Sequence, residues 1–496
     1  MKRRQHTFVV VAVLFGFGLT SCTGSSTAPG SSSATSAPPS TSIAVTSTSS
    51  QPPLSEAPVG SPSAPSSAEP TPTPASSSAP LTLQSTHDRL FQPLLATLAR
   101  DLQGGRAPAF LASFAPALRT RVGQWFANAT TLGVAAAQFV PADDYSSGAT
   151  DAAGTFSRTV VLGIRTPYDD AGTLPGIPYR IDVAVSTSKG RSVLTVTGWK
   201  PAFLADPLDC GCKLGVVHSA TVAVVFAAAD PDLAFWSASA LRAASDAVTW
   251  ADQQLAGSGL TPPHGQVIFL ADRPFRWFLG ANAPPQESNV TVPLSDALGP
   301  GQGGSHATQS RIVVMLLGSD HVVVPNDEQG REYVSDVAAH ESTHQLMNRN
   351  SQLAYRTDDS PPTWGAEGVA VAVEVLHRQA LGDAGDIGYP EPYDPADIDP
   401  AWLRAHLSDA MPTRSQIYSS SATDSAGYYA LSGSVFLYLN QAYGYRTMMQ
   451  VGAALYAKAN QNPFALFPDP SHLGGHLPVA QATANWRAWF TGRYLG

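Results

Sequence analysis

The stretch His340-Glu341-Ser342-Thr343-His344 constrains the fold of this chain more than any other. On an α-helix, residues four apart lie on one face about 6 Å apart along the axis, so two imidazoles at this spacing can reach one Zn²⁺. Glu341 falls beside that face, where its carboxylate can take a proton from a water molecule activated by the ion. The sequence therefore predicts a helix that carries two metal ligands, His340 and His344, and a general base, Glu341. The alternative is a surface helix with two solvated histidines.

A third metal ligand is expected in the helix that follows. Two prolines end the preceding segment, and the run from Trp364 to Glu374 is rich in Ala and Val. An acidic side chain inside an apolar helix is costly unless it is paired or bound to a metal, and Glu367 is such a residue. Glu374 lies seven residues further on the same helix face. It is the weaker ligand candidate, and it can instead hold a ligand histidine or carry an exposed charge.

The order of these motifs is a family resemblance. H-E-x-x-H, then P-x-W-x-x-E-G-x-A, then a further Glu resembles the gluzincin zinc metallopeptidases, the thermolysin-like group, and within them the peptidase MA-like branch. The resemblance implies that His340, His344 and Glu367 bind Zn²⁺ and that Glu341 is the general base. It covers roughly residues 213–450.

The likeness continues into a tyrosine-rich helix. The run that starts at Tyr428-Tyr429 and is followed by Tyr443-Gly444 is similar to a helix that such peptidases commonly carry after the metal site. Hydrolysis needs a group that stabilises negative charge on the former carbonyl oxygen, and the resemblance points to one of the two leading tyrosines. Tyr429 shares a helix face with Phe436, the expected buried stripe, so Tyr428 is the predicted donor. Both tyrosines can also be packing aromatics.

The N-terminus predicts export. A basic start is followed by an apolar stretch, Thr7 to Leu19, that is too short to span a bilayer. Leu19-Thr20-Ser21-Cys22 resembles a bacterial lipobox, in which Cys22 becomes the lipidated first residue. We therefore expect residues 1–21 to be a lipoprotein signal peptide and Cys22 to anchor the protein on the outer face of the membrane. An ordinary cleaved signal peptide is the alternative.

Residues 22–84 are dominated by Ser, Pro, Thr, Ala and Gly. Such a segment cannot bury enough apolar surface to offset the entropy of ordering it, so we expect a disordered tether. The net charge of -9 is modest for 496 residues, and no cluster of Lys and Arg follows the tether. The sequence therefore gives no support for nucleic-acid binding.

The remaining chain is long enough for two α+β domains, expected over residues 85–205 and 213–496. Helices followed by antiparallel strands make the first domain similar to NTF2-like or cystatin-like cones. Its role is open between a ligand pocket and a packing or substrate-presenting module. We expect its helices over His87–Leu102 and Ala107–Asn128, and its strands over Thr155–Arg165, Tyr179–Thr187 and Ser192–Trp199.

The second domain is expected to have a small sheet, the metal-binding helices and a helical part beyond Pro400. We expect Ser335 to cap the first metal-binding helix, with Asp336 in its first turn. By the resemblance, Arg311–Leu317 is an edge strand that pairs with an extended substrate. The other expected elements are a strand over His218–Ala227, a helix over Asp230–Leu255 and a strand over Gln266–Ala271, with loop material between the last strand and Arg311.

Cys210-Gly211-Cys212 lies between the two expected domains. In an exported chain a local disulfide is favoured, with two free thiols or a metal site as alternatives, although structural zinc sites need four ligands.

Together these features predict a zinc-dependent peptidase, anchored by lipid to the cell surface, that acts on a peptide or protein substrate. Two other functions share the same residues: a catalytically inactive relative that keeps zinc and holds cell-envelope material, and a zinc hydrolase of a non-peptide amide or ester. An intact Glu341 argues against the inactive relative, because a structural site does not need that carboxylate.

Overall fold

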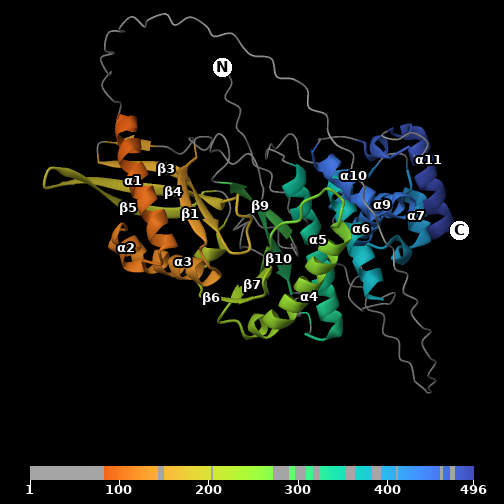
Figure 1. Cartoon of the computed structure of the whole chain (residues 1–496), viewed down its shortest axis with the longest axis horizontal. Coiled ribbons are helices and arrows are strands. Elements are labelled where there is room, and N and C mark those ends of the chain that lie inside the picture. Colours follow the sequence, from red (N-terminus) through yellow and green to blue (C-terminus); the bar gives the residue numbers. More distant parts are fainter. Residues whose placement is uncertain are drawn as a thin grey trace, which may run out of the picture. The chain divides into compact units, whose positions relative to one another are not determined.

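The structure, a computed structural model, describes residues 83–142, 150–152, 154–202, 205–271, 290–296, 309–316, 324, 326–351, 363–382, 393–408, 411–419, 421–457, 462–469 and 475–496 (Figure 1). The predicted signal peptide, the lipidated Cys22 and all but the last two residues of the predicted tether lie outside these residues. Leu83 and Gln84 already belong to the first helix. No helix in the described part of the chain has the length and apolarity needed to cross a membrane.

The first elements are three helices followed by antiparallel strands. The helices are α1 (Leu83–Gln103), α2 (Ala107–Ala112) and α3 (Arg119–Leu132), and the strands are β1 (Ala136–Pro141), β2 (Thr150–Ala152), β3 (Thr155–Arg165), β4 (Pro175–Ser188) and β5 (Arg191–Pro201). Strand β3 pairs with β1, β2 and β4, and β4 pairs with β5. A two-residue turn joins β4 to β5, with φ of 50° at Lys189 and 72° at Gly190, as tight hairpins require.

The single helix predicted over Ala107–Asn128 is wrong. Pro116 has no N–H to donate and forces Ala115 into an extended conformation, with φ of -57° and ψ of 144°. The chain therefore leaves α2, makes a short 3₁₀ turn at Pro116–Leu118 and re-enters a helix at Arg119.

Five further strands extend the same sheet. They are β6 (Leu214–His218), β7 (Val222–Ala227), β8 (Gln266–Ala271), β9 (Val290–Asp296) and β10 (Gln309–Met315), in the order β9-β10-β8-β7-β6. Strands β7, β8 and β10 are parallel, and β9 is antiparallel to β10. Strand β9 also pairs with β4, through Pro175 with Asp296 and Gly176 with Ser295, so one sheet runs through both halves of the described chain.

Three predictions about these strands are wrong. The strand predicted over His218–Ala227 begins only at Val222, because β6 ends at His218 and the chain reverses before β7. Strand β9 occupies a segment that was expected to be a loop. Strand β10 is not an edge strand, because β9 and β8 pair with its two sides.

The parallel strands are buried on both faces. Along β7, β8 and β10, alternate side chains belong to two apolar cores, as the two-residue period of a strand requires. Val224, Ile268 and Val314 face the core that contains α4, α5, α6 and α9. Val225 and Phe269 face the core built with α1, α3 and the strands of the N-terminal half. Residues Thr82–Gly496 cluster as one compact unit, and the division into domains over 85–205 and 213–496 stays a prediction.

A buried ion pair also joins the two halves. Asp169, between β3 and β4, accepts two hydrogen bonds from the guanidinium of Arg311 on β10, at 2.6 and 2.9 Å. The next residue, Asp170, accepts from Gln309 and pairs with Arg349. Arg349 lies in the last turn of the helix that carries the H-E-x-x-H motif, so the N-terminal half contacts that helix directly.

The remaining elements are mostly helical, as expected beyond Pro400. The helices are α4 (Pro231–Leu255), α5 (Glu328–Ser351), α6 (Thr363–Leu381), α7 (Pro400–His406), α8 (Arg414–Ile417), α9 (Ala422–Tyr443), α10 (Tyr445–Ala457) and α11 (Val479–Phe490). The prediction that Ser335 caps α5 is wrong. The helix starts at Glu328, where the Asp327 side chain accepts from the Gly330 N–H, and Ser335 lies inside it.

Candidate metal centre

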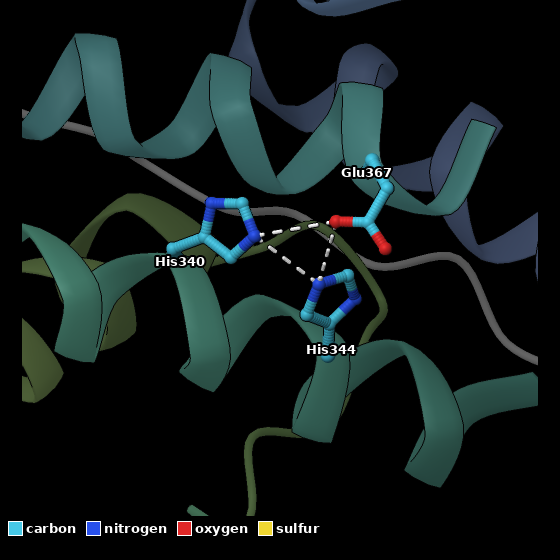
Figure 2. A group of neighbouring side chains, drawn as sticks. All are labelled: His340, His344 and Glu367. Atoms are coloured by element: carbon cyan, nitrogen blue, oxygen red, sulfur yellow. Dashed lines mark hydrogen bonds and ion pairs between the residues drawn. The ribbon is translucent and has the colours of Figure 1, made fainter. Parts of the chain in front are cut away.

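Helices α5 and α6 bring the three predicted ligands together. His340 and His344 lie one turn apart on α5, with their Nε2 atoms 3.3 Å apart. The Glu367 side chain projects from α6 and places Oε2 3.5 Å from each of these nitrogens (Figure 2). All three residues are buried, and their potential ligand atoms lie within 4.8 Å of one another.

A glycine beside Glu367 allows the ligand helix to pack closely. A Cβ on Gly368 would lie 2.7 Å from the backbone oxygen of Ser432 on α9, a distance that real Cβ atoms do not reach. A Cβ on Gly433 would lie 2.4 Å from the Val371 side chain of α6. Helices α6 and α9 therefore approach each other closely at both glycines, one of which directly follows Glu367.

Each histidine is oriented through its other ring nitrogen. His340 Nδ1 lies 3.0 Å from Glu374 Oε2, and His344 Nδ1 lies 2.7 Å from the Tyr456 hydroxyl. These contacts leave both Nε2 atoms facing Glu367. Such partners behind ligand histidines fix ring orientation and strengthen metal binding. Glu374 therefore holds a predicted ligand histidine, the role that the sequence analysis gave as its alternative to binding the metal. Tyr456, which is 112 residues from His344, was missed.

Glu374 is itself held by buried charges. Arg378 Nη2 lies 3.5 Å from Glu374 Oε1, and Arg378 Nε donates to Asp336 Oδ2 at 3.1 Å. Asp336 Oδ1 also contacts His377 Nδ1 at 3.0 Å. Asp336, which the sequence suggested as a first-turn residue of α5, is instead part of a chain of contacts that ends at His340.

The electrostatics of the cluster favour a cation. Burial lowers the pKa of His340, but its contacts with the carboxylates of Glu367 and Glu374 outweigh burial and raise the pKa to about 10. Burial also favours a neutral Glu367, but the neighbouring His344 and His340 lower its pKa to about 2. The cluster therefore stabilises a positive charge between the imidazoles and the carboxylate.

The three residues fit Zn²⁺. Two imidazoles and a carboxylate are the protein ligands of many catalytic zinc sites. Glu367 Oε2 is buried and accepts no hydrogen bond from the described residues, although buried carboxylate oxygens normally do. His340, His344 and Glu367 would hold a zinc ion that satisfies this oxygen and both Nε2 atoms.

Glu341 lies beside the cluster, fixed by one oxygen. Its Oε2 accepts a hydrogen bond of 2.7 Å from the Thr291 hydroxyl of β9. Its Oε1 is buried and accepts none from the described part of the chain. Burial raises the pKa of Glu341, with the charges of His340 and His344 opposing that rise. Thr291 was missed because its strand was expected to be a loop.

Tyr428 and Tyr429, the two tyrosines considered as oxyanion donors, have different surroundings in the structure. The Tyr428 hydroxyl accepts from Gln416 Nε2 at 3.0 Å, and its ring packs edge-on against Trp402. Tyr429 is fully buried and stacks on Tyr393 with ring centroids 4.4 Å apart. A second phenol besides Tyr456 contacts a predicted ligand: the Tyr418 hydroxyl donates to Glu367 Oε1 at 3.1 Å. Tyr418 follows α8 outside any motif, and the role of Tyr428 stays a prediction.

Comparisons with known proteins add little to this site. No protein-family model and no curated protein matches the chain. A mutant M1 zinc metallopeptidase from Deinococcus radiodurans has a TM-score of 0.28 and 14% identity over 62% of this chain and 59% of that one. A two-domain M1 zinc metallopeptidase mutant bound to L-tryptophan has a TM-score of 0.26 and 13% identity over 62% and 58%. The M1 zinc metallopeptidase from Deinococcus radiodurans has a TM-score of 0.26 and 13% identity over 71% and 73%.

The chain thus spans less than two thirds of the first two of these structures. The residues of the metal centre, rather than these matches, support the function proposed below.

Proposed function

We propose that this chain is a zinc-dependent metallopeptidase that hydrolyses peptide bonds with Glu341 as general base. One observation carries the proposal: a buried glutamate stands beside the His–His–Glu cluster with one oxygen held by Thr291 and the other free of hydrogen bonds from the described residues. A structural zinc site takes four protein ligands and has no use for such a carboxylate.

Each residue of the site has a separate role in the proposed hydrolysis. Bound Zn²⁺ supplies Lewis-acid chemistry and makes a neighbouring water a stronger acid. Glu341 accepts the proton of the attacking water at Oε1, while Thr291 holds Oε2 and so fixes the direction of the carboxylate. The same carboxyl group then delivers the proton to the leaving amine, which restores its ionised state. Glu374 and Tyr456 keep the two imidazoles in place throughout.

We propose that the substrate adds as a strand to β9. Only Ser295 and Asp296 of this strand pair with β4, and the residues from Val290 to Leu294 have a partner on the β10 side alone among the described strands. An extended peptide beside Thr291 would gain main-chain hydrogen bonds, with specificity left to side-chain pockets.

Glu341→Gln tests the enzyme against an inactive zinc-containing binding module. The amide keeps the shape but cannot take the proton, so cleavage of a mixed-peptide substrate should fall by at least about 10²-fold with zinc content unchanged. Glu328→Gln makes the same chemical change on an exposed residue of α5 and should leave cleavage intact. Equal cleavage by wild type and Glu341→Gln contradicts the proposal.

Two tyrosines compete as the donor to the developing oxyanion. If Tyr428 has this role, Tyr428→Phe lowers kcat by about 10–10³-fold without changing zinc content. Tyr418→Phe removes the hydrogen bond to Glu367 and should weaken zinc binding as well as turnover. If Tyr428→Phe leaves kcat unchanged, while Tyr418→Phe lowers kcat without lowering the zinc content, the donor is Tyr418 and not Tyr428.

We also propose that the protein is a lipoprotein held on the outer face of the membrane through Cys22. The apolar stretch from Thr7 to Leu19 is too short to span a bilayer, so the acyl chains on Cys22 would be the anchor. Cys22→Ser should move the protein from the membrane fraction to the soluble fraction. Retention of this variant in the membrane contradicts the proposal.

We propose that residues 85–205 are an NTF2-like or cystatin-like module. Its main role would be to cover one apolar face of the sheet. Support comes from the order of α1–α3 and β1–β5 and from the apolar face of β7, β8 and β10 that packs against them. A chain that starts after residue 205 should therefore expose side chains such as Phe269 and aggregate, as seen by light scattering. A soluble, monomeric product contradicts the proposal.

A further inference from the structure

A second reactive site lies outside the metal centre. Cys210 and Cys212 form a disulfide between the short helical turn Pro207–Asp209 and strand β6, as the sequence favoured. Cys210 and Gly211 are exposed, whereas Cys212 is half-buried and packs against the core of the N-terminal half. The proposed peptidase reaction uses neither sulfur.

This disulfide has little to stabilise. The stabilisation that a cross-link gives grows with the length of chain that it closes, and these cysteines are only two residues apart. It therefore restricts the unfolded chain less than almost any other disulfide would.

The folded loop is also held without the sulfurs. Buried Asn128 donates to the backbone oxygens of Leu208 and Cys212, each at 2.9 Å, and accepts from the N–H of Leu214 at 3.0 Å. On the N-terminal side, the Asp206 carboxylate accepts from the Leu208 N–H at 2.9 Å. These hydrogen bonds fix both ends of the loop, so reduction of the disulfide can leave the fold in place.

The Cys210 sulfur accepts one hydrogen bond, from the Cys212 N–H at 3.2 Å, and the Cys212 carbonyl oxygen lies 3.2 Å from the same sulfur. A hydrogen-bond donor stabilises the negative charge of a sulfur that leaves as a thiolate. Exposed disulfides are also the labile ones, since an incoming thiolate can approach them.

We propose that Cys210-Gly211-Cys212 is a thiol–disulfide exchange site that reacts with thiols from outside the molecule. An incoming thiolate attacks the exposed Cys210 sulfur and forms a mixed disulfide, while the bond to Cys212 breaks and Cys212 leaves with the electron pair. A second thiolate attacks the external sulfur of that mixed disulfide and releases Cys210 as a thiolate. Two external thiols are thereby oxidised to one disulfide, and the protein gains two electrons as its dithiol.

The exchange can be measured in the full chain with Cys22→Ser, so that only Cys210 and Cys212 carry sulfur that can titrate. Samples are equilibrated in glutathione buffers of increasing reducing power, quenched with an alkylating reagent and weighed by mass spectrometry. We expect both cysteines to become alkylated together while circular dichroism and the thermal midpoint stay unchanged. A pair that stays oxidised until the protein unfolds, or whose reduction unfolds it, overturns the proposal.

Single-cysteine variants test which of the two sulfurs is the more accessible to an outside reagent. Oxidised glutathione should modify Cys210 in Cys212→Ser at least about 10-fold faster than Cys212 in Cys210→Ser, because Cys210 is exposed and Cys212 is half-buried. Equal rates would show that Cys210 is not the more accessible sulfur and overturn its assignment as the attacked one. A second arm replaces glutathione with reduced, unfolded ribonuclease, and faster oxidation of its thiols than by oxidised glutathione at equal concentration identifies protein dithiols as the substrate.

The site is independent of the proposed peptidase. Glu341→Gln should exchange thiols at the wild-type rate, and Cys210→Ser should keep the zinc content of the wild type. Failure of peptide cleavage therefore leaves this proposal standing, and failure of exchange leaves the peptidase standing.

Discussion

Two clusters of buried charge in the described residues differ in their geometry. At the seam between the halves, Asp169 and Arg311 are 4% and 5% exposed and make two short, parallel hydrogen bonds. The backbone N–H and the hydroxyl of Thr166 add two more to Asp169, each of 2.8 Å. The Asp169 carboxylate is fully satisfied.

The metal centre is as deeply buried but is not satisfied in this way. Glu367 is 0% exposed, yet its Oε2 lies 3.5 Å from its nearest nitrogens, and those nitrogens face each other. Burial alone therefore does not separate a functional charge cluster from a structural one. What separates them is whether the polar atoms have completed their hydrogen bonds with one another or converge on a point that needs a further atom.

The largest expected effect is on stability, when the buried ion pair between Asp169 and Arg311 is broken. Arg311→Met leaves the Asp169 carboxylate buried without its partner and should lower the free energy of unfolding by about 3–5 kcal/mol. The double variant Asp169→Asn with Arg311→Met buries no unpaired charge and should lose clearly less. Denaturant titration measures both, and zinc bound per folded molecule should stay unchanged. A loss of zinc affinity in either folded variant would break the distinction between the two clusters.

At the metal centre the expected result is the opposite. Glu367→Gln removes the proposed third ligand, so zinc affinity should fall by at least about 10²-fold, beyond the usual effect of residues that only support a ligand. Competition with a chromogenic chelator gives the affinity. If Glu367→Gln keeps zinc and Glu374→Gln loses it, the third ligand is Glu374.

The pH dependence of stability sharpens the comparison in the N-terminal half. Burial raises the pKa of Asp206 to about 6, although Trp125, Leu208 and Tyr179 donate hydrogen bonds that oppose the rise. The folded protein thus holds this proton more tightly than the unfolded chain does. The stability that follows is complete below about pH 4 and is lost as the pH rises towards about 6, by at most about 3 kcal/mol.

Asp206→Asn should remove that part of the pH profile of the unfolding free energy. Asp246→Asn, an exposed carboxylate of α4, should leave the profile unchanged and serves as the control. A wild-type profile in Asp206→Asn would show that this carboxyl group does not titrate near pH 6.

The smallest effect on zinc affinity is expected for residues that contact a ligand histidine but do not bind the metal. Glu374→Gln keeps the size of the side chain but weakens its hold on His340, so zinc affinity should fall by about 10–100-fold. Asp336→Asn lies one contact further from His340, through Arg378, and should cost less. A larger loss in Asp336→Asn than in Glu374→Gln would show that the chain of contacts does not act through Glu374.

The parts of the fold that the sequence predicted well are those set by local pattern. Strand Gln266–Ala271, strand Thr155–Arg165 and the long helix that starts after Asp230 have the expected bounds. In each, apolar periodicity and the flanking turn or cap residues agree. Two predictions failed at prolines. Pro116 breaks a segment whose periodicity predicted one helix. Pro293 lies inside strand β9, although proline argues against a strand.

The metal centre could be predicted only as far as its motifs reach. The spacing of His340 and His344 and the apolar helix around Glu367 predict a metal site, and the structure brings the three residues together. Thr291 and Tyr456 have no such spacing, because their positions depend on how β9 and α10 pack against α5. Asp336 was misread for the same reason: it resembles a first-turn acid until its partners on α6 are known.

The continuous sheet has a consequence for the order of events during synthesis. Asp169 and its partner Arg311 are 142 residues apart, so the N-terminal half is made long before the strands that cover its apolar face. At about 5–20 residues per second, that face waits roughly 10–30 s for its partner. Contacts of such large sequence separation also form slowly once the chain is complete. The nascent chain should therefore depend on a chaperone during this interval, and pausing of translation between residues 202 and 309 should increase aggregation.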